Sequence, residues 1–167
     1  MLFCISLSAC KDVTVQEQTT GQTLCFDYYQ ACINPVLTKA IALTTGAEAT
    51  CSAEGCHNVE VGAGGAFKLN RRATLHSAEM MGNYISAKSF ANLSDPASSK
   101  LLLEPLAGTF SIVGSHAGGD IFADPSDIHY REIYYWISNS VDASVLSCPS
   151  LDQFPNDPNR RCLLDDG

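Results

Sequence analysis

The stretch Cys51-Ser52-Ala53-Glu54-Gly55-Cys56-His57 places two thiols and an imidazole within one short segment. Two cysteines followed directly by a histidine are the attachment signature of c-type haem. Each thiol can add to one vinyl group of a porphyrin, and the adjacent imidazole can bind the iron as proximal ligand. The motif therefore predicts one covalently bound haem, held by Cys51 and Cys56 with His57 on the iron.

The spacing of this motif leaves two other interpretations open. The usual attachment signature has two residues between the cysteines, whereas this sequence has four. The pair could instead form a disulfide with an incidental histidine beside it. It could also be part of a zinc site, but zinc needs further ligands at short spacing, such as a second cysteine pair. No such pair follows nearby.

The composition around this motif is that of a single globular domain. The chain has 167 residues, of which 46% are hydrophobic and 17% are charged, so whole-chain disorder is excluded. The net charge is −8 and the only adjacent arginines are Arg71–Arg72 and Arg160–Arg161, which excludes a general nucleic-acid binder. No apolar run reaches the ~18 residues that a membrane-spanning helix needs.

The N-terminus carries two of the eight cysteines. An apolar stretch from Leu2 ends in Leu7-Ser8-Ala9-Cys10, which resembles a bacterial lipoprotein signal. The resemblance implies cleavage before Cys10, lipid on Cys10 and loss of Cys4 with the signal. Residues 1–9 are then a signal remnant and residues 10–24 a tether. The other interpretation is a buried N-terminal strand with two structural cysteines.

Four further segments follow the cysteine motif in order. They are Val61-Gly62-Ala63-Gly64-Gly65-Ala66-Phe67-Lys68-Leu69, Asp95-Pro96-Ala97-Ser98-Ser99-Lys100-Leu101-Leu102-Leu103-Glu104-Pro105-Leu106, Ser115-His116-Ala117-Gly118-Gly119-Asp120-Ile121-Phe122 and Tyr130-Arg131-Glu132-Ile133-Tyr134-Tyr135-Trp136-Ile137. This order resembles a group of bacterial monohaem c-type cytochrome domains, over residues 25–140. The resemblance implies a mostly α, cytochrome c-like helical domain wrapped around one covalent haem c, with residues 141–167 as a C-terminal extension.

The hydrophobic spacing independently predicts helices at four places. The first helix is marked by Phe26, Tyr29, Ile33, Leu37 and Ile41, with Pro35 as a break or a helix start, and the second by Leu75, Ala78, Met81 and Ile85. The third helix is short and runs from Pro96 to Leu103. The last helix has Tyr130, Ile133, Trp136 and Ile137 on its apolar face, with Asp127 or Ser126 as cap. The Gly-rich turns at 62–65 and 118–119 predict backbone that approaches a flat ring closely.

The second iron ligand is predicted from the resemblance. In such cytochromes the distal ligand commonly lies between the Leu-rich helix and the closing helix, where this chain has His116. The prediction is therefore bis-histidine ligation by His57 and His116. Met80, Met81 and His76 are alternative ligands, and His116 could instead bond a haem propionate. His129, like His76, is predicted as a surface or capping residue, or as a ligand to a neighbouring subunit's haem.

Four cysteines remain, namely Cys25, Cys32, Cys148 and Cys162. An even set in an exported protein predicts two disulfides. The predicted pairing is local, with Cys25 bonded to Cys32 and Cys148 to Cys162. The alternative pairing links the N-terminal and C-terminal extensions across the domain.

These features predict an electron-transfer cytochrome that is not an enzyme. We expect it to be exported to the periplasm or the cell surface and anchored to the membrane through lipid. Its partners are then redox proteins and not nucleic acid. An alternative is a haem-bearing subunit of a homo-oligomer, larger complex or extracellular filament. An enzyme or gas sensor with an open iron position, and a disulfide-stapled adhesive lipoprotein without haem, are the remaining interpretations.

Overall fold

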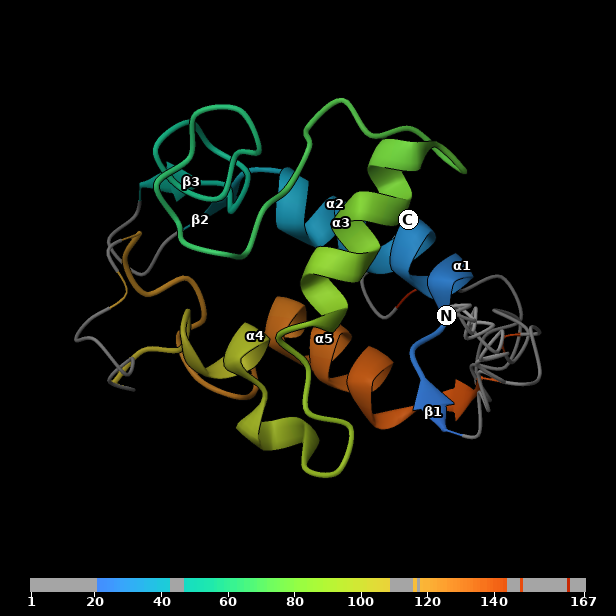
Figure 1. Cartoon of the computed structure of the whole chain (residues 1–167). Helices are drawn as coiled ribbons and strands as arrows, with labels where there is room; N and C mark the ends of the chain where they lie inside the picture. The colour runs from blue at the N-terminus through green and yellow to red at the C-terminus, as the bar shows by residue number, and fades with distance from the viewer. Residues whose placement is uncertain are drawn as a thin grey trace, which may run out of the picture.

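The computed structural model describes residues 21–42, 47–108, 116, 118–143, 148 and 162. The elements (Figure 1) are β1 (Gln22–Thr23), α1 (Phe26–Tyr28), the π-helical turn η1 (Tyr29–Ile33), α2 (Asn34–Thr38), β2 (Ile41–Ala42), β3 (Glu48–Ala49), α3 (Ala78–Lys88), the 3-10 turn η2 (Pro96–Ser98), α4 (Lys100–Leu103), α5 (Ile128–Ser138) and β4 (Val141–Asp142). Helices make up 38% of the described residues, so the cytochrome c-like class stays a prediction.

Two predictions lie partly or wholly outside these residues. Cys4 and Cys10, on which the lipoprotein signal depends, fall outside them, as does most of the predicted extension 141–167. Within the described ranges, no helix has both the length and the apolar character needed to cross a membrane.

The first predicted helix is a continuous helical segment through α1, η1 and α2. Cys25 begins it, because its Sγ accepts a hydrogen bond from the backbone N–H of Tyr28 at 3.3 Å. Pro35 lies in the first turn of α2, directly after the π-helical turn η1. The segment ends at Thr38, so Ile41, predicted in the helix, instead belongs to β2 and pairs with Ala49.

The closing helix α5 begins at its predicted cap. The Asp127 side chain accepts hydrogen bonds from the backbone N–H groups of His129, at 2.8 Å, and Tyr130, at 3.3 Å. The predicted apolar face is buried, and α5 contacts η1 and α4 with it. Trp136 is 1% exposed, and its indole N–H donates to the carbonyl of Cys25 at 2.9 Å. This contact fixes the two ends of the described chain together.

The predicted apolar stripe of α3 is wrong. Leu75, Met81 and Ile85 are 65%, 40% and 56% exposed, so they lie on the solvent side. The buried residues of α3 are Met80, Asn83, Tyr84 and Ala87. The buried face contains an asparagine because its amide donates to the Asn34 side chain and to the Asn70 carbonyl, both at 3.0 Å.

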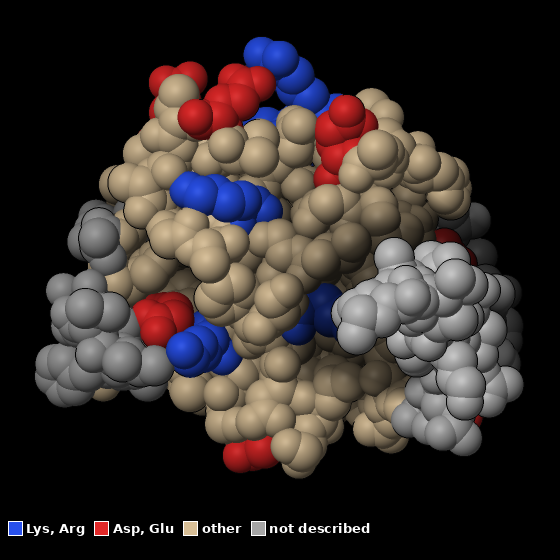
Figure 2. Space-filling view, viewed as in Figure 1, with Lys and Arg blue, Asp and Glu red and all other residues tan. Residues whose placement is uncertain are grey.

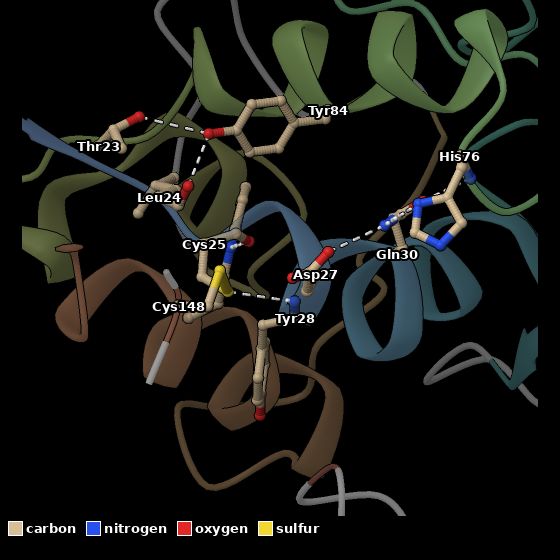
Figure 3. Close-up of a disulfide and its surroundings, with 10 residues drawn as sticks. Thr23, Leu24, Cys25, Asp27, Tyr28, Gln30, His76, Tyr84 and Cys148 are labelled. Atoms are coloured by element: carbon tan, nitrogen blue, oxygen red, sulfur yellow. Dashed lines mark hydrogen bonds between the residues drawn. A yellow bond between two sulfur atoms is a disulfide. The ribbon is translucent and has the colours of Figure 1, made fainter. Parts of the chain in front are cut away.

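The predicted local disulfides are also wrong. Cys25 bonds to Cys148 (Figure 3) and Cys32 bonds to Cys162, which is the alternative pairing across the domain. The physical reason is proximity in the fold. Strand β1 pairs antiparallel with β4, so the start of the domain lies beside the segment that leads toward the last cysteines.

Candidate haem site

A cavity of about 710 Å³ is lined by all four residues that the sequence assigns to haem binding, Cys51, Cys56, His57 and His116. In Figure 1, the segment around residues 50–66 (teal) and the segment around residues 118–124 (orange) lie on the same side of the molecule. Side chains from three helices and three phenylalanines complete much of the wall: Leu37, Leu101, Ile133, Phe67, Phe90 and Phe122. A cavity of this size and lining is typical of a cofactor site.

The long spacer between the two cysteines is folded back on itself. The backbone N–H of His57 donates to the carbonyl of Cys51 at 2.9 Å, and the N–H of Cys56 donates to the carbonyl of Ala53 at 3.0 Å. Gly55 has a φ of 79°, a left-handed conformation that favours glycine. The two extra residues are thus taken up in a turn, and both ends of the motif line one cavity.

Cys51 and Cys56 are free thiols, so the disulfide interpretation of the motif is not what the structure shows. Burial raises the pKa of the Cys51 thiol to about 12, with the neighbouring Cys56 adding to the shift. At neutral pH, Cys51 is therefore protonated, and it is not an activated thiolate.

The donor atoms of the motif do not gather as a zinc site would require. Among the described residues, the one group whose possible ligand atoms lie within 4.8 Å of one another is Cys32, Glu132 and Cys162. Two members of that group are joined in a disulfide.

His57 is held as a neutral imidazole with a defined tautomer. Its Nδ1 lies 2.9 Å from the carbonyl oxygen of Gly64 and 3.0 Å from that of Phe67. Because a carbonyl oxygen only accepts, Nδ1 carries the hydrogen and Nε2 carries the lone pair. Burial lowers the pKa of His57, hydrogen bonds to the two carbonyls oppose this, and the charges of His116 and Lys68 lower it further. A neutral imidazole with a free Nε2 is what a metal requires.

The His116 ring is also oriented by a backbone carbonyl. Its Nδ1 lies 3.0 Å from the carbonyl oxygen of Gly119, so Nδ1 donates this hydrogen bond and Nε2 is the nitrogen left for a metal. The ring centres of His57 and His116 are 6.1 Å apart, and the ring planes differ by 19°. Imidazole nitrogens bind a first-row metal at about 2 Å, so ligands on opposite sides of one ion have ring centres roughly 6 Å apart. The separation of the two ring centres is therefore the one that two imidazole ligands of a single iron would have.

The other predicted ligands lie elsewhere. Met80 is buried in the core at 2% exposure, and Met81 is exposed. His76 is exposed on the segment before α3, where its backbone N–H donates to the side chain of Gln30 at 2.7 Å (Figure 3). None of these three residues lines the cavity among the described positions.

The cavity wall also contains residues that the sequence did not single out as site residues. Lys100 and Glu104 are the charged side chains in the described lining. They stand four residues apart on α4 and the residue after it, so they share one helical face. A lysine and a glutamate four residues apart are common on helices, so this spacing does not mark a site. Only the position of the Leu-rich segment in the cavity wall shows that the two residues belong to it.

Comparison of this chain with family models, with curated proteins and with solved structures finds no match, so the resemblance to c-type cytochrome domains stays a prediction.

Proposed function

We propose that this protein is an electron-transfer cytochrome that holds one haem c through Cys51 and Cys56, with His57 and His116 as the two iron ligands. One observation carries the proposal. Two free thiols and a pair of near-parallel imidazoles with centres 6.1 Å apart line the same apolar cavity.

The residues of the cavity have separate roles in this proposal. Cys51 and Cys56 would hold the haem covalently, and His57 and His116 would bind its iron. The phenylalanines of the wall would exclude water from the haem, and Lys100 would offer a cation to its carboxylates. A haem bound here would supply a one-electron iron couple.

Two histidine ligands favour electron transfer over chemistry at the iron. An iron with both axial positions filled has no open position for oxygen or peroxide. A nitrogen ligand in place of a thioether also lowers the reduction potential, because methionine ligation raises it. The proposal is therefore a low-potential carrier that exchanges electrons with other redox proteins.

The compartment and the partners belong to the same proposal. Two disulfides are typical of exported proteins, which supports a periplasmic or cell-surface location. Figure 2 shows acidic and basic side chains in small groups separated by uncharged surface. This arrangement, with a net charge of −8, supports protein partners rather than nucleic acid.

The test is expression in a host that attaches c-type haem, followed by a pyridine haemochrome spectrum of the full chain. We expect one haem per chain that stays attached under denaturing conditions. Cys51→Ala and Cys56→Ala each leave a single thioether bond, which shifts the haemochrome band. A protein without covalent haem would contradict the proposal.

The ligand assignment is tested with a matched pair of histidine variants. His116→Ala opens one axial position, so the ferric spectrum becomes high-spin and the reduced protein binds CO. His76→Ala removes an exposed histidine outside the cavity and leaves the spectra unchanged. If His116→Ala retains the wild-type low-spin spectrum, another residue is the ligand.

A further inference from the structure

We propose that Gly64 and Gly118 are positioning residues that fix the planes of the two iron-binding imidazoles nearly parallel. This inference rests on the proposed function and adds the geometry of the ligand pair. The observation behind it is that each histidine ring lies against the backbone of a glycine, where an added Cβ atom would overlap the ring of His57 and crowd the ring of His116.

Gly64 leaves the space that the His57 ring fills. A Cβ atom at this position would lie 2.3 Å from Nδ1 and 2.7 Å from Cε1 of His57. The same residue accepts a hydrogen bond from Nδ1 at 2.9 Å and donates its N–H to the carbonyl of Cys56 at 2.6 Å. The loop is therefore tied to the motif while its backbone lies against the ring.

Gly118 has the corresponding place beside His116, with a looser fit. A Cβ atom there would lie 3.0 Å from Cε1 and 3.4 Å from Nδ1 of His116. The next residue, Gly119, accepts the hydrogen bond from Nδ1 at 3.0 Å. Turning either ring about its Cβ–Cγ bond breaks a hydrogen bond to a carbonyl and moves ring atoms relative to the glycine. Each ring plane is thus set by the loop, and the two planes differ by 19°.

The angle between the planes has an electronic consequence. Each imidazole donates π density along the direction perpendicular to its own plane. Near-parallel planes make the two in-plane directions of the iron unequal, which gives a rhombic ferric signal with three resolved g values. Perpendicular planes leave those directions almost equivalent, which gives one broad feature at large g. Hydrogen bonds that orient a ligand ring therefore affect the metal.

The experiment is electron paramagnetic resonance of the full-length ferric holoprotein. We expect the wild type to show the rhombic signal. Gly118→Ala adds a methyl group that the His116 ring must yield to by a few tenths of an ångström, so its g values shift while the site stays low-spin. Gly82→Ala is the matched control, because a Cβ atom at Gly82 meets nothing within 4 Å, and its g values equal those of the wild type.

Gly64→Ala is the more severe variant, since its Cβ atom would overlap the ring of His57. We expect lower haem incorporation, or a high-spin ferric state that binds CO on reduction. A single large-g signal from the wild-type protein, or a Gly118→Ala spectrum identical to the wild type, would overturn the inference. Either result leaves the haem and its two histidines in place, whereas a protein without haem refutes the proposed function.

Discussion

Two adjacent tyrosines at the α1–η1 junction differ in hydrogen bonding: the hydroxyl of Tyr28 has a partner, and that of Tyr29 has none among the described residues. Tyr28 donates a short hydrogen bond to the carboxyl group of Glu132, which is fully buried. The Tyr29 ring packs against Tyr84 and Trp136, and its buried hydroxyl has no hydrogen-bond partner in the described part of the chain. Burial raises the pKa of Tyr29, so this hydroxyl is neutral.

Removing each hydroxyl should therefore have a different effect on stability. Tyr28→Phe takes a donor from a buried carboxyl group and lowers the free energy of unfolding by about 1–3 kcal/mol. Tyr29→Phe removes an unpaired buried hydroxyl, so the free energy of unfolding stays equal or rises by about 1 kcal/mol. Urea denaturation of the two variants beside the wild type measures this. Equal losses in both variants would mean that Tyr29 has a partner.

At the scale of elements, the start of α5 was predictable because its capping signal is local, whereas the first helix ends at Thr38, before the predicted Ile41. Asp127 caps α5 through N–H groups two and three residues later, and it is one of the two capping residues, with Ser126, that the sequence of that segment offers. The solvent-facing side of α3 was predicted as its buried face. The spacing of apolar residues indicates a helix, but it does not show which face packs against the rest of the protein. Asn83 is buried through bonds to Asn34 and Asn70, and such non-local partners cannot be seen in the pattern.

The two methionines of α3 test which face of the helix carries the packing. Met80 is 2% exposed and Met81 is 40% exposed, so the two neighbours are a matched pair. We expect Met80→Ala to lower the free energy of unfolding by about 2–5 kcal/mol. Met81→Ala should change it by no more than about 0.5 kcal/mol. Thermal or urea unfolding gives both values. If Met81→Ala lowers the free energy of unfolding more than Met80→Ala does, the buried face of α3 is the one predicted from the sequence.

At the scale of the whole molecule, the sequence singled out four residues that line one cavity, Cys51, Cys56, His57 and His116, whereas the disulfide pairing predicted from it is wrong. The motif around His57 is a contiguous signal, so haem attachment there is a prediction from residue types alone. His116 could be proposed only through the resemblance, because 58 residues separate it from His57. The disulfide pairing was missed because sequence distance favours local bonds, whereas β1 and β4 bring distant segments together.

The cross-domain pairing makes a direct prediction for peptide mapping. Digestion without reduction should release one peptide pair that contains Cys25 and Cys148 and another that contains Cys32 and Cys162. Replacing Cys25 and Cys148 together by serine opens a loop of 123 residues and should lower the free energy of unfolding by about 2–5 kcal/mol. A linked Cys25–Cys32 peptide would contradict the pairing in the structure.

The two bridges also determine how the chain would carry a mechanical load. A pull applied before Cys25 and after Cys162 passes through the covalent bonds Cys25–Cys148 and Cys32–Cys162. The segment between residues 33 and 147, which contains all the described residues that line the cavity, lies inside the closed loops and is not stretched. Tension between the two ends of the chain would therefore leave the spacing of His57 and His116 unchanged until a sulfur–sulfur bond breaks.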